Sequence, residues 1–209
     1  FLTTSADLYS SNKNYLSGAG DFSAETPEGR NFWFGIREHA MAAICNGIAY
    51  DGLFRVSAAT FCVFVDYMRA SIRVAALSGL PVTYILTHDS VAVGEDGPTH
   101  QPVEQTASLR LIPNMDVWRP CDTTESAVAW ACAIERKDGP TTMCFSRQNL
   151  PFQVRTSDQV SAIRQGGYVL AEAAGNKAQA VIIATGSEVA LAMAAQQTLA
   201  DEGIAVRVV

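Results

Sequence analysis

The chain has 209 residues with 15 basic and 21 acidic side chains, which gives a formal net charge of −6 at pH 7. This acidic balance argues against a nucleic-acid-binding surface, which normally carries an excess of Lys and Arg. Only 17% of the residues are charged and 48% are hydrophobic, so the composition excludes a disordered chain. The longest uncharged stretch, residues 74–87, is too short to cross a bilayer, and we expect no membrane contact.

The cysteines indicate the cellular compartment of the protein, and the two ends of the sequence indicate the extent of the chain. Five cysteines are scattered along the sequence and none forms a Cys-x-x-Cys pair. This usage is typical of free thiols in a reducing compartment, so we expect a cytoplasmic protein. The chain opens on Phe1 and stops within the β-like run 205–209. We therefore expect it to be a piece of a longer polypeptide.

Short apolar runs alternate with longer amphipathic stretches after residue 30, which indicates βα units on a mostly parallel sheet flanked by helices. Strands are expected over 31–36, 54–59, 82–87, 115–118 and 141–145, and helices over 37–49, 61–78, 103–111 and 122–137. Asp122 followed by Glu125 is typical of a capping box at the start of the last helix. Residues 88–102 contain glycines, prolines and acids, and they predict a long loop of the kind that is usually functional.

A change in composition predicts two domains. The chain turns polar after residue 147, which indicates a first domain over 1–147 and a linker over 148–165. A truncated second α/β domain is expected over 166–209. Within it we expect strands over 168–170 and 180–184, a turn at Gly175, a helix over 188–200 and a final strand that stops at the end of the chain.

The run Gly94-Glu-Asp-Gly-Pro-Thr-His-Gln-Pro102 carries the densest set of reactive side chains. His88 lies just before it at the end of an apolar strand, and ligands of open α/β sheets bind outside the carboxyl ends of strands. His88, Asp96 and His100 are therefore candidate ligand-binding residues. A solvated loop with incidental histidines fits the spacing equally well. A zinc site is disfavoured because no thiol and no His pair at helical spacing lies nearby.

Two other groups each allow a functional and a structural interpretation. Glu38 lies at a strand-to-helix junction, where the helix dipole alone would favour a carboxylate. Phe61, Phe64 and Tyr67 recur at three-residue spacing, a pattern that is more common in a packed core than around a cofactor. Neither group decides the function by itself.

Together these segments resemble the transketolase family. Ile36-Arg-Glu-His-Ala-Met41, Ala59-Thr-Phe-x-x-Phe-x-x-Tyr67, the run from Thr87-His-Asp-Ser90 to His100-Gln-Pro102, and Ser146-Arg-Gln-Asn-Leu-Pro151 occur in that family's order and approximate spacing. The resemblance implies the family's pyrimidine-binding middle domain, a thiamine-diphosphate-binding fold, followed by the start of its C-terminal domain. The family's N-terminal domain, which holds the diphosphate and a Mg²⁺ or Ca²⁺ ion, has no counterpart in these residues, so no metal ligand is expected.

The resemblance implies cofactor contacts at five positions. Glu38 is similar to the catalytic carboxyl that hydrogen-bonds N1′ of the aminopyrimidine. Phe61, Phe64 and Tyr67 are similar to the aromatic pocket around that ring. Asp7 is expected to support the cofactor indirectly.

The resemblance also implies substrate contacts. His100 is similar to a catalytic histidine that hydrogen-bonds substrate hydroxyls and the developing alkoxide. Asp96 is similar to the acid that reads the C2 hydroxyl of the substrate. Ser11, His88 and Arg147 match the positions that hold the sugar phosphate, for which a guanidinium is well suited.

The implied reaction transfers a two-carbon ketol unit from a ketose phosphate, such as xylulose 5-phosphate, to an aldose phosphate, such as ribose 5-phosphate. The resemblance implies a homodimer with the cofactor at the subunit interface, and it predicts that residues 1–209 alone are inactive. The segments 88–102 and 146–151 favour this family over 1-deoxyxylulose-5-phosphate synthase. A dihydroxyacetone synthase and a non-catalytic subunit or fragment stay open.

Overall fold

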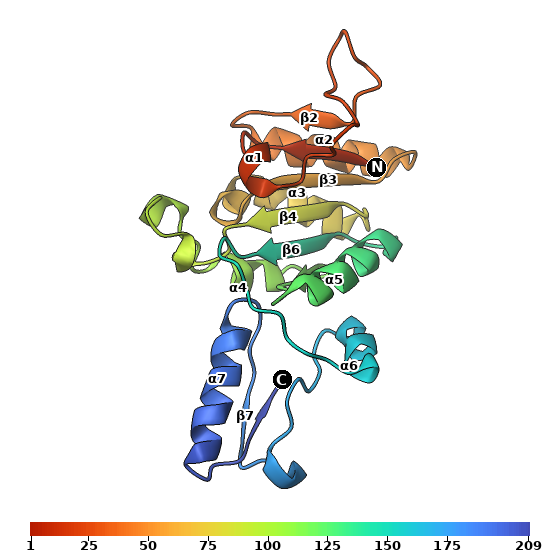
Figure 1. Ribbon diagram of the computed structural model, residues 1–209. Coiled ribbons are helices and arrows are strands. Elements are labelled where there is room, and N and C mark those ends of the chain that lie inside the picture. Colours follow the sequence, from red (N-terminus) through yellow and green to blue (C-terminus); the bar gives the residue numbers. More distant parts are fainter. The chain divides into compact units, whose positions relative to one another are not determined.

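The computed structural model describes all residues, Phe1–Val209, and divides into two compact units. The first unit comprises Phe1–Trp118 with Ala133–Gln148. It contains a six-stranded sheet in the order β2-β1-β3-β4-β6-β5, in which every neighbouring pair is parallel (Figure 1). The strands are β1 (Leu2–Ser5), β2 (Asn31–Trp33), β3 (Val56–Phe61), β4 (Thr83–Thr87), β5 (Asp116–Trp118) and β6 (Thr141–Phe145). The predicted α/β class with a parallel sheet is confirmed.

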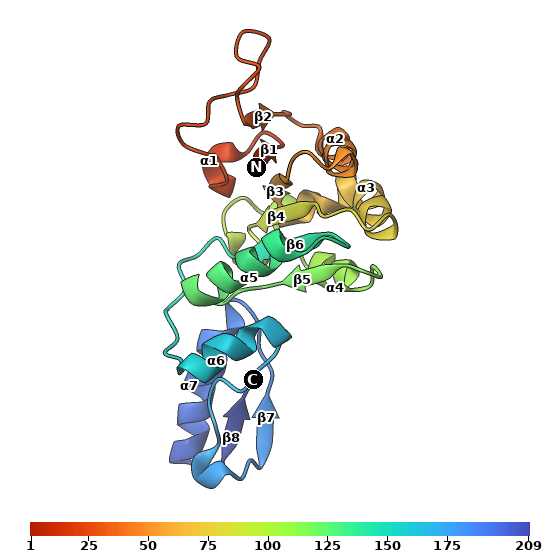
Figure 2. The same cartoon turned by 90° about the vertical axis from the view of Figure 1, so that its right-hand side faces the viewer.

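Helices cover both faces of this sheet. They are α1 (Tyr9–Asn12), α2 (Glu38–Asp51), α3 (Val65–Leu77) and α4 (Gln105–Arg110), whereas α5 (Thr123–Glu135) belongs mostly to the second unit. Figure 2 shows α2 and α3 together on one side of the sheet and α1 on the other. Met41 of α2 and Met68 and Ile72 of α3 are fully buried in the core. Every residue of β3 and β4 is buried, as expected for parallel strands covered on both faces.

The sequence did not predict strand β1, because three of its four residues are polar. The structure buries all four and places β1 between β2 and β3. Thr4 Oγ1 donates a hydrogen bond to the carbonyl of Ser57 (3.0 Å), and Thr3 Oγ1 donates to the carbonyl of Asn14 (3.1 Å). Because these hydroxyls have partners, a polar strand can lie inside the sheet without unpaired groups.

The second unit comprises Arg119–Cys132 with Asn149–Val209. It contains a two-stranded parallel sheet of β7 (Ala180–Ile182) and β8 (Val206–Val208), the helix α7 (Glu188–Asp201) and the short helix α6 (Ser157–Ala162). None of the helices in the chain has both the length and the apolar composition needed to span a bilayer.

One prediction for this region is corrected, and another gains detail. The strand expected over 168–170 is wrong, since only an isolated bridge from Ala171 to Val208 forms there. The segment expected as a linker contains α6, which Thr156 and Gln159 begin with a capping box. This local signal outweighs the polar composition. The predicted domain limits stay a prediction.

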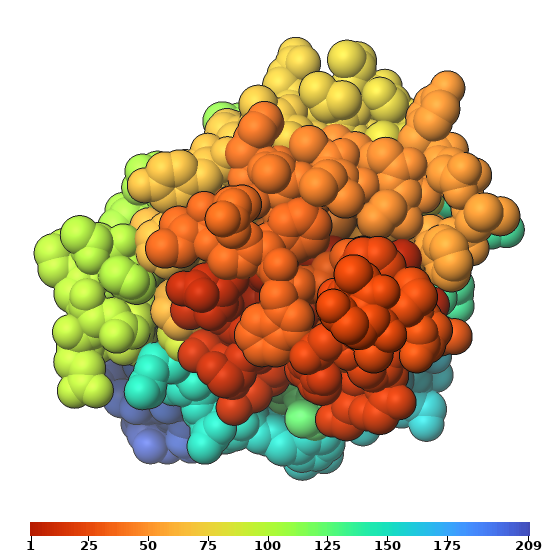
Figure 3. Space-filling view, turned by 90° about the horizontal axis from the view of Figure 1, so that it is seen from above, coloured from red at the N-terminus to blue at the C-terminus, as the bar shows by residue number.

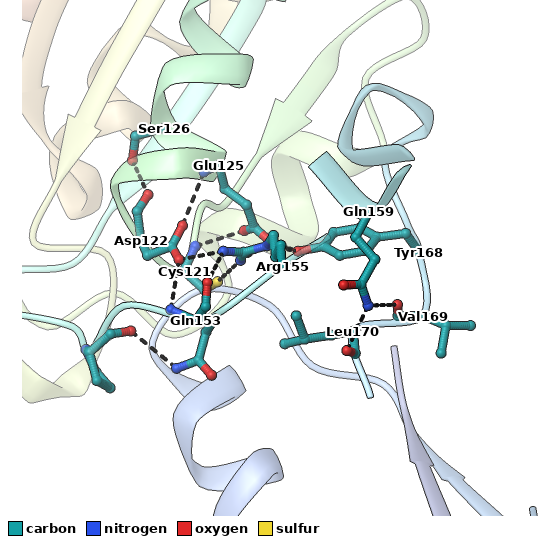
Figure 4. Close-up of polar contacts among 11 residues, drawn as sticks. Cys121, Asp122, Glu125, Ser126, Gln153, Arg155, Gln159, Tyr168, Val169 and Leu170 are labelled. Carbon is teal, nitrogen blue, oxygen red and sulfur yellow. Dashed lines mark hydrogen bonds and ion pairs between the residues drawn. The ribbon is translucent and has the colours of Figure 1, made fainter. Parts of the chain in front are cut away.

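A buried polar cluster in the second unit surrounds Arg155 (Figure 4). We call Cys121, Asp122, Glu125, Arg155 and Tyr168 the Arg155 cluster. The guanidinium lies 2.5 Å from an Asp122 oxygen and 3.1 Å from a Glu125 oxygen, and Tyr168 donates to that Glu125 oxygen at 2.7 Å. Asp122 Oδ1 accepts from the backbone N–H of Glu125, which confirms the predicted cap of α5. The cluster therefore ties residues 155 and 168 to the first turn of α5.

Candidate active site

The predicted site residues gather at one edge of the six-stranded sheet. All six strands are parallel, so their carboxyl ends meet at the same edge, where ligands of such sheets bind. The residues at or after the ends of β1, β2, β3, β4 and β6 are, in that order, Asp7 and Ser11, Glu38, Phe61 with Phe64 and Tyr67, His88, and Arg147. The loop 88–102, drawn in yellow-green, projects at the left of Figures 1 and 3.

Five rings form an aromatic cluster at this edge: Phe61, Phe64, Tyr67, His88 and His100. Phe61 and Phe64 are nearly parallel, with centroids 6.3 Å apart, and Tyr67 lies 6.2 Å from Phe64. His88 stacks on Phe61 at 3.7 Å, and His100 meets Phe64 edge-on at 5.1 Å. The structure thus joins the predicted aromatic residues to both loop histidines.

The backbone beneath these rings differs from the single helix predicted over 61–78. Phe61 ends β3, the 3-10 turn η1 (Cys62–Phe64) follows, and α3 begins only after it. Because of this change of backbone, the three side chains differ in their exposure to solvent. Phe61 is buried, whereas Tyr67 is 68% exposed. The aromatic spacing is therefore not simply a core pattern, because its outer member contacts solvent.

His88 is held in an unusual backbone conformation at the end of β4. Its φ of 59° lies in the left-handed region, which few residues other than glycine adopt. Burial lowers the pKa of His88, and the positive charge of Arg147 lowers it further. Asp96 and Asp89 act in the opposite direction, while His100 adds to the lowering. Three of the predicted site residues, Asp96, His100 and Arg147, are therefore among the charged groups that act on the His88 ring.

Glu38 is the first residue of α2 and is buried. Gly35, with a φ of 61°, turns the chain between the end of β2 and this helix. No group of the chain hydrogen-bonds or pairs with the Glu38 carboxyl. A buried carboxyl without an internal partner is costly unless a ligand or water satisfies it. Glu38 is therefore available to a ligand at the carboxyl edge of the sheet.

Residues 88–102 form a loop, as predicted, and this loop contains two short 3-10 turns. These are η2 (Val91–Val93) and η3 (Pro98–His100). Gln101 Nε2 donates to the carbonyl of Gly94 (3.1 Å) and closes the segment between them. His100 Nδ1 lies 2.8 Å from Thr99 Oγ1, and Asp96 is exposed. The loop thus presents an exposed carboxylate and an imidazole whose orientation is fixed.

The remaining predicted residues are exposed. Asp7 has a φ of 64° and precedes α1, which carries Ser11. Arg147 follows β6 and is exposed as well. The topology of the sheet positions Asp7, Ser11 and Glu38 at the same edge, and none of their side chains is hydrogen-bonded to the aromatic cluster.

Sequence reasoning missed Asn12 and Thr87. Thr87 Oγ1 donates to Asn12 Oδ1 at 2.7 Å, and both residues are buried. This bond fixes α1, and with it Ser11, to the end of β4. Two short polar residues that lie far apart in sequence carry no signal that could have paired them in advance.

The aromatic cluster and the Glu38 carboxyl fit the heteroaromatic ring of a thiamine cofactor. Flat aromatic rings with exposed surface suit a heteroaromatic ring, since offset stacking contributes about 0.5–1.5 kcal/mol per pair. The unpaired Glu38 carboxyl suits a polar ring nitrogen. No group of three or more His, Cys, Asp or Glu side chains in the chain is arranged to hold a metal ion.

Comparisons with known proteins relate this chain to one family. Residues 1–153 match the family described as "Transketolase, pyrimidine binding domain", and residues 166–209 match "Transketolase-like TK C-terminal domain". The chain is 53% identical to a transketolase of Bacillus subtilis over 100% of its length and 54% identical to one of Physarum polycephalum over 96%. It spans 32% and 31% of those two proteins, which is about a third of the length of the relatives that it matches.

Solved structures give the same result. A Pichia stipitis transketolase in complex with sedoheptulose 7-phosphate superposes with a TM-score of 0.94 at 42% identity, over 99% of this chain and 31% of that one. A transketolase from Leishmania mexicana superposes with a TM-score of 0.94 at 44% identity, over 99% and 30%. A more distant structure, at 28% identity and a TM-score of 0.73, is described as a split-gene transketolase, an inactive β4 tetramer, and this chain covers 62% of it.

Proposed function

Because the chain belongs to the transketolase family, we propose that it supplies the pyrimidine side of a thiamine-diphosphate-dependent active site for ketol transfer. The substrates would be a ketose phosphate, such as xylulose 5-phosphate, and an aldose phosphate, such as ribose 5-phosphate. The observation that carries the proposal is the carboxyl edge of the sheet, where a buried, unpaired Glu38 follows β2 and the aromatic cluster follows β3 and β4, with β1 between β2 and β3.

The cofactor-facing residues bind and orient a ring. Thiamine diphosphate, when bound, supplies a nucleophilic carbon and an electron sink. Phe61, Phe64 and Tyr67 would hold the aminopyrimidine and exclude water from it. Glu38 would hydrogen-bond N1′ of that ring, and its burial would strengthen this hydrogen bond because the local dielectric constant is low. Asp7 supports this arrangement from the end of β1.

The substrate-facing residues form two groups, one for the reacting end of the sugar and one for its phosphate. His100 hydrogen-bonds substrate hydroxyls and stabilises the negative charge that develops on an adjacent oxygen. Asp96, exposed on the same loop, accepts a hydrogen bond from the C2 hydroxyl of the substrate. Ser11, His88 and Arg147 hold the phosphate, and the charge of Arg147 at His88 supports this grouping.

The proposal includes partners outside this chain. The diphosphate and a Mg²⁺ or Ca²⁺ ion would be held by an N-terminal domain, and the active unit would be a homodimer with the cofactor between subunits. The five free cysteines support a cytoplasmic location. The split-gene relative described as inactive supports the expectation that residues 1–209 do not turn over alone.

The test is an assay of the full-length protein with xylulose 5-phosphate, ribose 5-phosphate, thiamine diphosphate and Mg²⁺. We expect two-carbon transfer in the unaltered protein and none from residues 1–209 under the same conditions. Absence of transfer by the full-length protein would contradict the proposed function. Turnover by residues 1–209 would contradict the division of the site between domains.

A further inference from the structure

A chain of buried hydrogen bonds runs from β1 through α1 and β4 to His88. Asn12 Nδ2 donates to Ser5 Oγ at 3.2 Å, and Thr87 Oγ1 donates to Asn12 Oδ1 at 2.7 Å. Thr87 Oγ1 also lies 2.9 Å from His88 Nδ1. All four residues are buried. We call Ser5, Asn12, Thr87 and His88 the His88 relay.

The relay determines which nitrogen of His88 carries the proton. The carboxamide oxygen of Asn12 can only accept, so the single hydroxyl proton of Thr87 points toward Asn12. Thr87 Oγ1 then has only lone pairs left for His88. Nδ1 of His88 must therefore be the donor of that hydrogen bond. In a neutral imidazole the other nitrogen, Nε2, then carries a lone pair and no proton.

The Nε2 atom is the part of the ring that a ligand can reach. It has no hydrogen-bond partner in the chain and is not among the enclosed side-chain atoms that lack one. The ring cannot easily turn to exchange its two nitrogens, because it is stacked on Phe61 at 3.7 Å. The charged groups that act most on the ring are Arg147 and, from the loop 88–102, Asp96, Asp89 and His100, and together with burial they lower the pKa of His88. Burial and these charges therefore favour the neutral form of the free ring.

We propose that Asn12 and Thr87 are positioning residues that fix His88 as the Nδ1–H tautomer, so that a dianionic phosphate binds at Nε2 only together with one proton. The proton comes from solvent and adds to the Nε2 lone pair. The resulting imidazolium donates through Nδ1 to Thr87 and through Nε2 to the anion. Arg147 differs from His88 because its guanidinium is always charged and needs no proton. The inference rests on the proposed function, in which His88 contacts the substrate phosphate.

Inorganic sulfate is the probe for this proposal, because it remains a dianion over the whole range in which a histidine titrates, about pH 5 to 8. The experiment measures its inhibition constant against the phosphorylated ketose with the full-length enzyme. We expect this constant to rise toward about tenfold per pH unit above the pKa of His88, since binding requires one proton. Calorimetry of sulfate binding in two buffers with different ionisation enthalpies should show an uptake approaching one proton on the alkaline side.

Thr87→Val removes the acceptor of the Nδ1 proton while keeping the shape of the side chain. The Nε2–H tautomer then becomes accessible, and we expect the pH slope of sulfate inhibition to flatten. Thr87→Ser keeps the hydroxyl and should retain the slope. Thr60→Val is the matched control, because Thr60 is a buried threonine whose hydroxyl has no partner, and its slope should equal that of the unaltered enzyme.

Three results would overturn the relay. They are sulfate inhibition that does not depend on pH in an active unaltered enzyme, the same slope in Thr87→Val as in Thr60→Val, and no proton uptake in the calorimeter. The calorimetric result needs no variant, so it stands even where Thr87→Val fails to fold. Failure of the proposed function is a separate outcome, because it would appear as an absence of ketol transfer in the unaltered full-length enzyme.

Discussion

Replacing Arg155 by Met should destabilise the second unit strongly. The Arg155 and Asp122 side chains are each 1% exposed, and the guanidinium also donates to Tyr168, to Glu125 and to the carbonyl of Gln153. Met fills similar volume but leaves the Asp122 and Glu125 carboxylates without their cation. Removing one partner of a buried ion pair costs about 3–5 kcal/mol, because the remaining charge stays buried and unpaired.

The assay is hydrogen exchange of the full-length protein, read at the two backbone amides that Asp122 accepts from, those of Glu125 and Gln153. A loss of 3–5 kcal/mol corresponds to a fall in protection of about two to nearly four powers of ten. Arg207→Met is the matched control in the same unit. Arg207 pairs with Glu172 at 2.9 Å, but the two side chains are 34% and 45% exposed, and such pairs contribute about 0–1 kcal/mol. Equal losses in the two variants would refute the reasoning.

Three further predictions concern pH and substrate binding. Burial raises the pKa of Asp122, but the hydrogen bonds from Arg155 and two backbone amides outweigh it and lower the pKa below its usual value. The contribution of Asp122 to the free energy of unfolding is therefore complete above its pKa in the unfolded chain and is lost as the pH falls through its pKa in the folded protein. An acid titration of the free energy of unfolding checks this, and we expect a smaller decline with falling pH in Asp122→Asn than in the unaltered protein. Arg147→Ala should raise KM for a phosphorylated donor about ten- to a hundredfold, with little change for an unphosphorylated donor, because a charged contact contributes about 1.5–3 kcal/mol; equal harm to both donors would indicate a structural role. Asp96→Ala should lower kcat/KM mainly for donors with the preferred hydroxyl configuration, and a uniform loss across a donor series would contradict its role in substrate recognition.

Strong apolar patterns allowed several elements to be predicted with nearly their observed bounds. β6 has the limits 141–145 that its sequence predicts, and α7 begins at Glu188 as expected. β1 could not be predicted in this way, because its threonines and serine become suitable for the core only when β2, β3 and Asn14 satisfy them. The strand expected over 168–170 was wrong for the opposite reason: its residues are apolar, but the backbone forms only the isolated bridge from Ala171 to Val208.

The candidate site shows the same division between local and distant signals. The spacing of Phe61 and Phe64 and the position of His88 after an apolar strand are local, so the sequence could indicate them. The bond between Asn12 and Thr87 joins residues 75 positions apart, and no local pattern encodes it. The left-handed backbone of His88 was likewise invisible, because nothing in its neighbours requires it.

The central claim is that Glu38 acts on the pyrimidine side of the cofactor, and one measurement tests it most directly. It is the rate of hydrogen–deuterium exchange at C2 of thiamine diphosphate bound to the full-length enzyme, compared between the unaltered protein and Glu38→Gln. Positioned acid–base groups typically contribute about 10²–10⁴-fold, so we expect exchange and kcat to fall together by that order while the cofactor still binds. Unchanged exchange in Glu38→Gln would contradict the account.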